Sequence, residues 1–254
     1  MTLYDETAIY KYSGRVPIIA ALVLVAVISA AWPASAQSRP GWCVPDKRPQ
    51  INIRPETKDI DYDFSKSIAQ INQKNIDTKS PYSDDVISRA GGLMSGGIRT
   101  KHRFKIATKT QRRRNLACAW FDTITVRMTI EPTIYVAREF DKGSCPRRAI
   151  LEHEQKHIRV DREIVNKYAR EIGQAVKGYI DSNPAYGPVR ANRLKDLQQR
   201  MTDQLDRLVS QVGRRMERER NRRQQNVDTR AEYERVRKQC RESQWPDEFN
   251  ARRR

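Results

Sequence analysis

Residues Cys145–Asp161 have the sequence CPRRAILEHEQKHIRVD, and the interpretation of the whole chain begins there. His153, Glu154 and His157 form the motif His-Glu-x-x-His in a chain that has only three histidines. Histidines at positions i and i+4 lie on one face of a helix, where they can bind a single zinc ion. The glutamate after the first histidine can then activate a zinc-bound water. We therefore predict a zinc site on a helix; the alternative is two histidines on a helix surface.

The predicted helix runs from Ala149 to Ile180, because apolar and motif residues recur there at spacings of three and four. Pro146 suits a first helical turn, and Ser144 or Cys145 is the candidate N-cap. Both histidines and Asp161 fall on the inward stripe of this helix. Buried polar groups need partners, and a metal ion would supply one.

The first 36 residues predict an export signal. Lys11 and Arg15 precede an apolar run, Val16–Trp32, and Ala34–Ala36 offers a cleavage site of the small-x-small type. The apolar run is shorter than the roughly 20 residues that a membrane span needs. An uncleaved N-terminal membrane anchor is the alternative, because acidic residues near the start are atypical of a signal. Both interpretations put the remaining chain outside the cytoplasm, in the periplasm or secreted.

Four cysteines remain in the exported part, and an even number in an oxidising compartment favours two disulfides. Three pairings are open. The pairing that we carry forward as a hypothesis joins Cys43 to Cys118 and Cys145 to Cys240.

The formal net charge of +18 suggests an anionic partner, such as lipid headgroups, acidic polysaccharide or nucleic acid. The basic helices are the candidate contact to such a surface, although most of the basic runs fit solvated faces and tails. Nucleic acid is not expected, because the protein is predicted to be exported. In addition, Arg214–Arg223 contains no aromatic residue that could stack on bases.

The chain is predicted to be α+β, with a zincin-like domain over residues 37–188 and a helical extension over residues 189–254. Alternating residues in Thr123–Ile130 predict a strand of a small antiparallel sheet, and Ile134–Ala137 is the candidate edge strand beside the motif helix. The segment Ser80–Gly97 is predicted to be a loop that borders the site. A second strand, His102–Thr110, and a short helix, Ser65–Ile76, complete this part.

In the extension, apolar residues from Leu194 to Met216 recur at helical spacing, and Ala231–Arg241 is predicted to be the last helix. We expect a helical hairpin that packs back on the motif helix. A coiled coil that binds a partner is the alternative.

A catalytic zinc needs a third protein ligand and an open position for water. Asp161 lies one turn beyond His157, so it is a candidate either for the third ligand or for a carboxylate that holds a histidine N–H. A straight helix rarely brings positions i, i+4 and i+8 to one ion, which favours the second role. His102 is a remaining candidate for the ligand.

The hypothetical Cys145–Cys240 disulfide suggests other third ligands, because it would lay the last helix antiparallel to the motif helix. His153 lies eight residues after Cys145, about 12 Å along a helix, and Glu232 lies eight residues before Cys240. Glu232 would then face His153, and Asp228 would lie near His157. In the same arrangement Tyr233 could polarise a substrate carbonyl. The alternative for Glu232 is an ordinary surface glutamate.

The chain resembles the predicted secreted zinc-dependent protease family of bacteria, through Ser144–Asp161 and, more weakly, through VDTRAEY at Val227–Tyr233. This resemblance implies that His153 and His157 bind zinc and that Glu154 is the catalytic acid and base. The chain departs from the family pattern near its end, where Tyr233-Glu234 stands in place of Tyr-Asp and no histidine follows.

The sequence thus predicts an exported zinc metallopeptidase that cleaves peptide or protein substrates in the cell envelope, with a water activated by Glu154. The alternative is a non-enzymatic envelope protein that binds a partner or an anionic surface and has a structural or vestigial metal site.

Overall fold

The structure is a computed structural model that describes residues 41–74, 78–80 and 89–247. The predicted export signal, residues 1–36, lies outside the described residues. The strands are β1 (Gln50–Thr57), β2 (Asp61–Asp63), β3 (Gly92–Ser95), β4 (Ile98–Gln111), β5 (Leu116–Ile130), β6 (Thr133–Val136) and β7 (Tyr186–Arg190). The helices are α1 (Ile68–Asn72), α2 (Cys145–Ser182), α3 (Leu194–Val227) and α4 (Arg230–Lys238). The described residues also include four short 3-10 helices, which are Gly41–Cys43, Arg112–Arg114, Ala191–Arg193 and Glu242–Gln244.

The described strands form two sheets, both of mixed direction. In the larger one, β5 pairs antiparallel with β4 along its length, parallel with β1 in its second half and antiparallel with β7 in its first half. In the smaller one, β6 lies between β2, which is parallel to it, and β3, which is antiparallel. The predicted α+β class is confirmed, but the prediction of an antiparallel sheet is wrong. Alternation is typical of an antiparallel strand with one buried face, but it does not exclude a parallel neighbour, and β1 is such a neighbour of β5.

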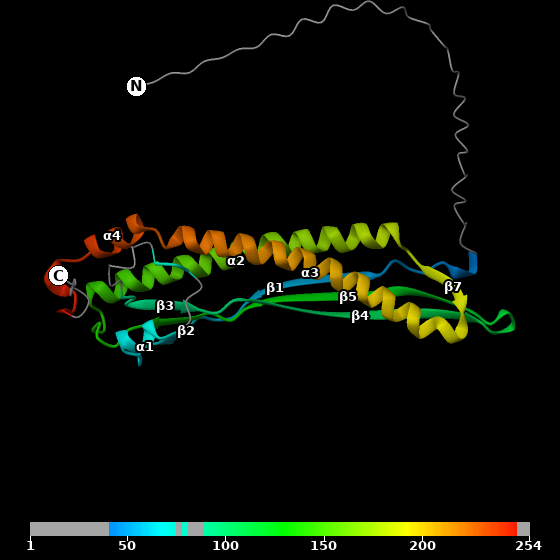
Figure 1. The fold of residues 1–254 in the computed structure, drawn as a ribbon, viewed down its shortest axis with the longest axis horizontal. Coiled ribbons are helices and arrows are strands. Elements are labelled where there is room, and N and C mark those ends of the chain that lie inside the picture. The colour runs from blue at the N-terminus through cyan, green and yellow to red at the C-terminus, as the bar shows by residue number, and fades with distance from the viewer. Residues whose placement is uncertain (1–40, 75–77, 81–88, 248–254) are drawn as a thin grey trace, which may run out of the picture. The chain divides into compact units, whose positions relative to one another are not determined.

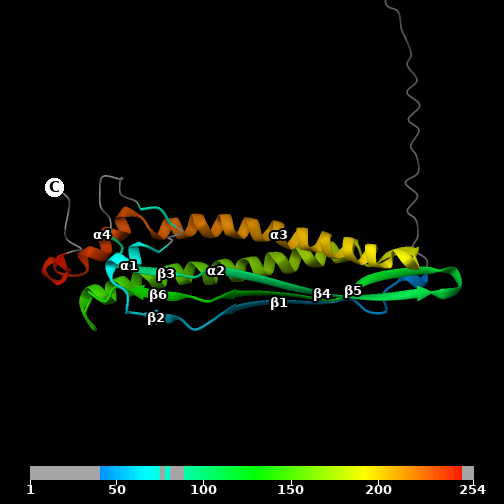
Figure 2. The same ribbon diagram turned by 60° about the horizontal axis from the view of Figure 1, so that its bottom comes forward.

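Helices α2 and α3 lie side by side across one face of the larger sheet (Figure 1). Their apolar stripes meet the inward residues of β5, so that Ile164, Leu205 and Val126 share one fully or nearly fully buried cluster. Each such aliphatic side chain contributes about 1.5–3 kcal/mol by leaving water. Figure 2 shows both helices on the same side of the strands. The motif helix is therefore held on two sides, by the sheet and by α3.

Local signals set the ends of α2. The Ser144 hydroxyl accepts a hydrogen bond from the Arg147 N–H, and Pro146 occupies the first turn, where a missing N–H costs nothing. The helix ends at Ser182, just before Asn183 and Pro184. It spans 38 residues and includes the whole range predicted from the periodicity.

The strand at the open edge beside α2 is β3, not the predicted segment Ile134–Ala137. Its first three residues, Ile134–Val136, lie in β6, which has a neighbouring strand on both edges. The strand β3 lies in the glycine-rich segment that was predicted to be a loop. The prediction missed this strand because glycines interrupt the alternating pattern by which a strand is recognised. Gly92 is required there: a Cβ at this position would lie 2.4 Å from Ile150 Cγ2 and 2.9 Å from Glu154 Oε1.

Two disulfides join distant parts of the chain, and they are the pairs that were carried forward as a hypothesis. Cys43–Cys118 ties the first 3-10 helix to β5, and Cys145–Cys240 ties the first residue of α2 to the segment after α4. Two disulfides suggest an oxidising, extracytoplasmic environment. Among the residues that the structure describes, no helix has the length and apolar character needed to cross a bilayer.

The double substitution Cys145→Ser and Cys240→Ser is expected to lower the free energy of unfolding by about 2–5 kcal/mol, because it releases a loop closed over 95 residues. Denaturant unfolding followed by circular dichroism measures the change. Reducing agent should lower the stability of the wild type and leave this variant affected only through its remaining disulfide. Equal stability of variant and wild type would contradict a structural role for this disulfide.

Candidate metal centre

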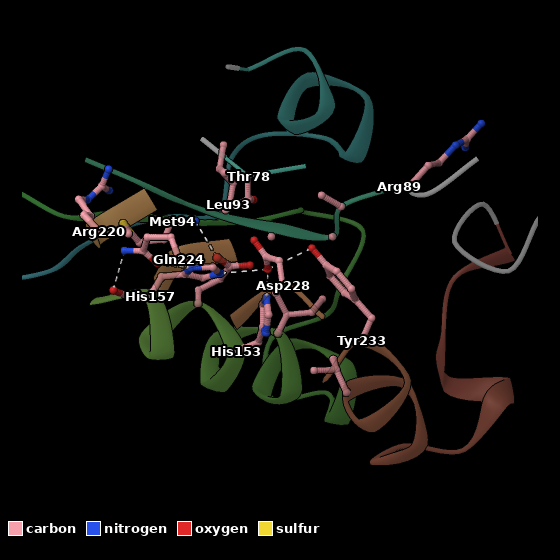
Figure 3. A pocket seen from close by; sticks show the side chains of 16 residues that line it. Thr78, Arg89, Leu93, Met94, His153, His157, Arg220, Gln224, Asp228 and Tyr233 are labelled. Carbon is pink, nitrogen blue, oxygen red and sulfur yellow. Dashed lines mark hydrogen bonds and ion pairs between the residues drawn. The ribbon is translucent and has the colours of Figure 1, made fainter. Parts of the chain in front are cut away.

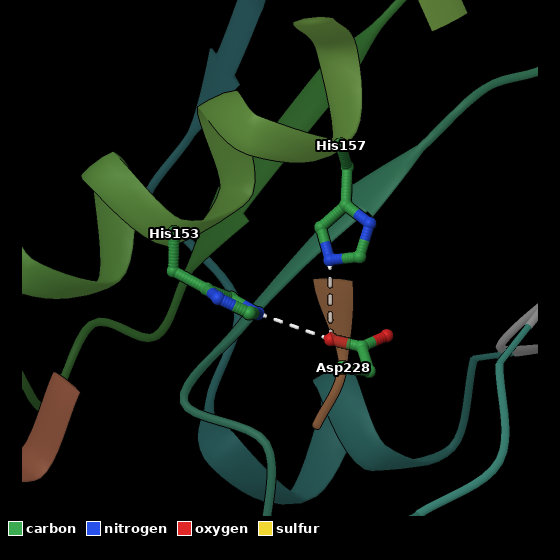
Figure 4. Close-up of side chains that lie close together, drawn as sticks. All are labelled: His153, His157 and Asp228. Carbon is green, nitrogen blue, oxygen red and sulfur yellow. Dashed lines mark hydrogen bonds and ion pairs between the residues drawn. The ribbon is translucent and has the colours of Figure 1, made fainter. Parts of the chain in front are cut away.

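The imidazoles of His153 and His157 converge on the carboxylate of Asp228. Both histidines project from one face of α2 and are 5 and 7% exposed, while Asp228 follows the last residue of α3. Their Nε2 atoms lie 3.1 and 3.2 Å from the same oxygen, Asp228 Oδ1 (Figure 4). The ligand atoms of the three residues all lie within 4.8 Å of one another. These three side chains form the candidate metal centre.

The other ring nitrogen of each histidine faces an oxygen acceptor. His157 Nδ1 lies 2.6 Å from Gln224 Oε1, and His153 Nδ1 lies 3.2 Å from Glu232 Oε1. An amide or carboxylate oxygen can only accept, so each Nδ1 carries the proton and donates it. Metal-binding histidines have this arrangement, in which an outer acceptor fixes the ring and leaves Nε2 for the ion.

Positive charge is required between the two Nε2 atoms and Asp228. A neutral imidazole with a proton on Nδ1 points a lone pair from Nε2, and two such lone pairs facing a carboxylate oxygen would repel it. In the metal-free protein, protons meet this requirement. Burial alone would lower the pKa of His157, but the hydrogen bond to Asp228 and the charges of Glu154 and Asp228 raise it to about 9. Although burial would raise the pKa of Asp228, hydrogen bonds from both histidines hold that pKa far below its usual value.

The donor set and its spacing also fit a metal ion. A tetrahedral zinc with bonds of about 2.0–2.2 Å holds its ligand atoms roughly 3.3–3.6 Å apart. The two Nε2–Oδ1 separations, 3.1 and 3.2 Å, are slightly shorter than that range, and all three ligand atoms lie within 4.8 Å of one another. Two imidazoles and one carboxylate are a ligand set of catalytic zinc sites. The three residues therefore could hold a metal ion, while the spacing does not select which one.

Glu154 is the second carboxylate at this centre, and it lines the same pocket as the three candidate ligands. Its Oε2 accepts a hydrogen bond of 2.7 Å from the backbone N–H of Met94 in β3. Burial raises the pKa of Glu154, against the opposing effect of the two nearby histidines. The pocket continues past Thr78, Leu93 and Tyr233 (Figure 3). It thus combines an apolar wall with a carboxylate that has a fixed orientation.

Asp161 is not part of the candidate metal centre; it contacts Gln224, the residue that faces the His157 ring. Its carboxylate is fully buried and pairs with Arg220, with Nε 2.7 Å from Oδ1 and Nη2 3.2 Å from Oδ2. Gln224 Nε2 donates to Asp161 Oδ1 at 2.7 Å and to the backbone carbonyl of His157 at 3.1 Å. These two donor contacts turn the amide oxygen of Gln224 toward the His157 ring. Asp161 therefore acts on His157 through Gln224 and makes no direct contact with the ring nitrogens.

The remaining predicted site residues take different places. Glu232 contacts the Nδ1 side of His153 and also pairs with Lys156 and Arg235, so its carboxylate is committed to these partners. Burial would raise the pKa of Glu232, but these three hydrogen bonds lower it to about 2. The Tyr233 hydroxyl donates to Asp228 Oδ1 at 3.1 Å. His102 pairs with Asp206 of α3 and is absent from the pocket lining.

Two residues of the site, Arg220 and Gln224, have only one signal in the sequence, and it is a weak one. Arg220 and Gln224 lie in the run Glu217–Gln225, whose nearly all charged or amide composition predicts either an exposed continuation of the helix or a hinge. Both are 3% exposed or less in the structure. Their spacing of four continues the apolar stripe of α3 past Met216, and this continuation was the one available signal.

Comparisons with protein-family models, curated proteins and solved structures found no match for this chain.

With zinc as the probe ion, replacing Asp228 with alanine is expected to abolish metal binding at the candidate centre, because it removes the oxygen that both Nε2 atoms face. Competition with a chromophoric zinc chelator measures the affinity. Asp203→Ala, which removes a carboxylate from α3 outside the pocket, is the control. Unchanged zinc affinity in the Asp228 variant would rule out this residue as a ligand.

Replacing Gln224 with leucine is expected to weaken zinc binding by about 10- to 100-fold, the usual effect of losing the partner that orients a histidine ligand. The same chelator competition measures it. Gln211→Leu, at an exposed position of the same helix, should leave the affinity unchanged. If both variants bind zinc as the wild type does, Gln224 does not orient His157.

Proposed function

We propose that this protein is a zinc-dependent metallopeptidase of the cell envelope. The observation that carries the proposal is the convergence of two imidazole Nε2 atoms and the Asp228 carboxylate in a pocket that a second carboxylate, Glu154, also lines. Catalytic zinc sites combine three protein ligands with an open position, and a carboxylate that is not a ligand serves as their general base. The resemblance of Ser144–Asp161 to the predicted secreted zinc-dependent protease family supports the same proposal.

In this proposal each residue has a definite task. When bound, zinc supplies Lewis acidity that activates a water and polarises the scissile carbonyl. Glu154 takes the proton of the attacking water and passes it to the leaving amine. Its Oε2 is tied to the Met94 N–H, so the carboxylate keeps one orientation. Its raised pKa suits a group that must accept a proton and then release it near neutral pH.

Tyr233 is the proposed partner of the substrate carbonyl. Its hydroxyl lies at the pocket, where it donates to Asp228 Oδ1 in the metal-free protein. An ion bound to Asp228 Oδ1 would compete for that oxygen, and the hydroxyl would then be available to donate to substrate.

The residues that line the pocket support a peptide as substrate. Its wall includes the edge strand β3, and strand addition beside such an edge is a common way to hold an extended peptide. Leu93, Ile150 and Val236 add an apolar surface that suits an uncharged side chain of the substrate. With two disulfides in the chain, we propose the periplasm or the outside of the cell as the place of action.

A non-enzymatic envelope protein is the second candidate, and one feature favours it. Both carboxylates at the centre already join separate elements: Asp228 links the end of α3 to α2, and Glu154 links α2 to β3. A bound ion would then serve stability, and Glu154 would serve only the attachment of β3. The two candidates differ in what Glu154 does when zinc is bound.

Replacing Glu154 with glutamine is expected to lower proteolysis by roughly 100- to 10,000-fold while zinc remains bound in stoichiometric amount. Glutamine keeps the size of the side chain and an oxygen that can accept from Met94, but it cannot take a proton from water. Hydrolysis of fluorescein-labelled casein and of a mixed quenched-fluorescence peptide library measures activity, and elemental analysis measures zinc.

Glu152→Gln is the matched control, because Glu152 lies in the same helix two residues earlier and its side chain is 54% exposed. It should hydrolyse both probes at the wild-type rate. Zinc-loaded wild type without hydrolysis, together with a large loss of thermal stability when zinc is removed, would favour the structural role and contradict the peptidase.

A further inference from the structure

The face of the larger sheet that points away from the helices is polar along β1, β4 and the second half of β5. Side chains alternate along a strand, and Ile53, Phe104 and Val126 face the helical layer. Their neighbours therefore face the other way. In Figure 2 the helices lie on one side of these strands only. Within the described part of the chain, no helix covers this polar face.

The strand register places twelve side chains on this face. They form four rows across the sheet, and each row has one residue from β1, one from β5 and one from β4. Six of them are cations and one is a carboxylate, and the rest are uncharged. We call the six cations the basic face; they are Arg54, Arg99, Lys101, Arg103, Lys105 and Arg127. All six are exposed. The carboxylate, Glu56, is already paired with Lys58 at the end of the face.

One row consists entirely of cations. Arg127 of β5 lies directly opposite Arg54 on one side and Lys101 on the other. Like charges directly opposite each other on neighbouring strands destabilise a sheet. Among the described residues, no ion pair involves any of these three side chains. An acidic residue in this row would keep the face soluble and would also stabilise the sheet, so solubility alone does not explain three cations side by side.

We propose that the basic face docks on an anionic phospholipid surface. Neighbouring strands are about 4.8 Å apart and alternate residues along a strand about 6.8 Å apart, so the cations form a two-dimensional array. Such an array matches a layer of headgroups, whereas a linear polyanion is followed by a single stripe of cations. Thr125 and Thr129, in the rows on either side of the all-cation row, add hydroxyls that can donate to phosphate oxygens, whereas the Thr123 hydroxyl donates to Asp122 Oδ2.

This assignment differs from the basic helices that the sequence suggested. Helix α3 has exposed arginines, but acidic residues are interspersed among them and weaken its field; these are Asp196, Asp203, Asp206, Glu217 and Glu219. Along β4 no acidic residue lies between Lys101, Arg103 and Lys105; Glu131 pairs with Arg99 at one end of the face, and Asp122 lies near Lys105 at the other. None of its six cations lines the pocket, so docking does not depend on the proposed peptidase activity.

The test compares two triple variants of the full chain that lose the same charge. Arg54→Gln, Lys101→Gln and Arg127→Gln neutralise the all-cation row. Arg207→Gln, Arg214→Gln and Arg218→Gln neutralise exposed arginines of α3. Sedimentation with vesicles of equal parts phosphatidylglycerol and phosphatidylcholine measures binding at physiological salt. Binding to pure phosphatidylcholine vesicles measures how much the apolar segment Val16–Trp32, which all variants share, contributes to vesicle binding.

The row variant is expected to bind the anionic vesicles on the order of a hundredfold more weakly, from the free energy that each juxtamembrane cation contributes. The helix variant should keep most of the wild-type affinity. The row variant should melt at or above the wild-type temperature, because repulsion in the sheet is relieved; this separates lost docking from lost folding.

Three results would overturn the proposal. The row variant could bind anionic vesicles as the wild type does. The helix variant could lose as much affinity as the row variant, which would assign binding to α3. Finally, the wild type could bind dextran sulfate but no phosphatidylglycerol vesicles, which would make the partner a linear polyanion.

Discussion

The centre of this protein is organised by one electrostatic constraint: two imidazole Nε2 atoms and a carboxylate oxygen lie around one point that must hold positive charge. The constraint exists because Gln224 and Glu232 occupy the Nδ1 side of each ring. Without those acceptors each ring could turn or exchange its proton between nitrogens. The fold supplies both acceptors and Asp228 from the α3–α4 region, which is fastened to α2 by packing and by the Cys145–Cys240 disulfide.

The buried ion pair between Asp161 and Arg220 is best understood through this constraint. Burying two charges costs several kcal/mol each. Well-packed apolar residues in the same place often give a protein that is equally stable or more stable. The pair is 0 and 3% exposed and lies between two long helices that already share a large apolar cluster. Its effect on the centre is geometric: Asp161 accepts from Gln224 and so selects which end of that amide faces His157. A leucine at position 161 could fill the space but could not make this selection.

How far the sequence predicts the structure depends on whether a feature is local. The helix α2, the convergence of its two histidines and the arrival of Asp228 and Glu232 near them follow from spacing along helices and from one disulfide. The parallel strand β1, the edge strand β3 and the burial of Arg220 and Gln224 do not, because each depends on a partner far away in the chain. Asp161 combines a local and a non-local feature. The helical periodicity of α2 predicts that its side chain points inward, but its pairing with Arg220 depends on how α3 packs against α2.

Substitutions on one face of the larger sheet leave the side chains of the other face unchanged. Val126 packs against the helices, and its neighbour Arg127 projects from the opposite face. A substitution at an inward position changes the surface on which α2 packs, and with it the spacing of the candidate metal centre. A substitution at an outward position changes the charge of the basic face and leaves that surface intact. Because the two sets alternate within the same strands, the charge of this face can vary without any change in the residues that hold the site.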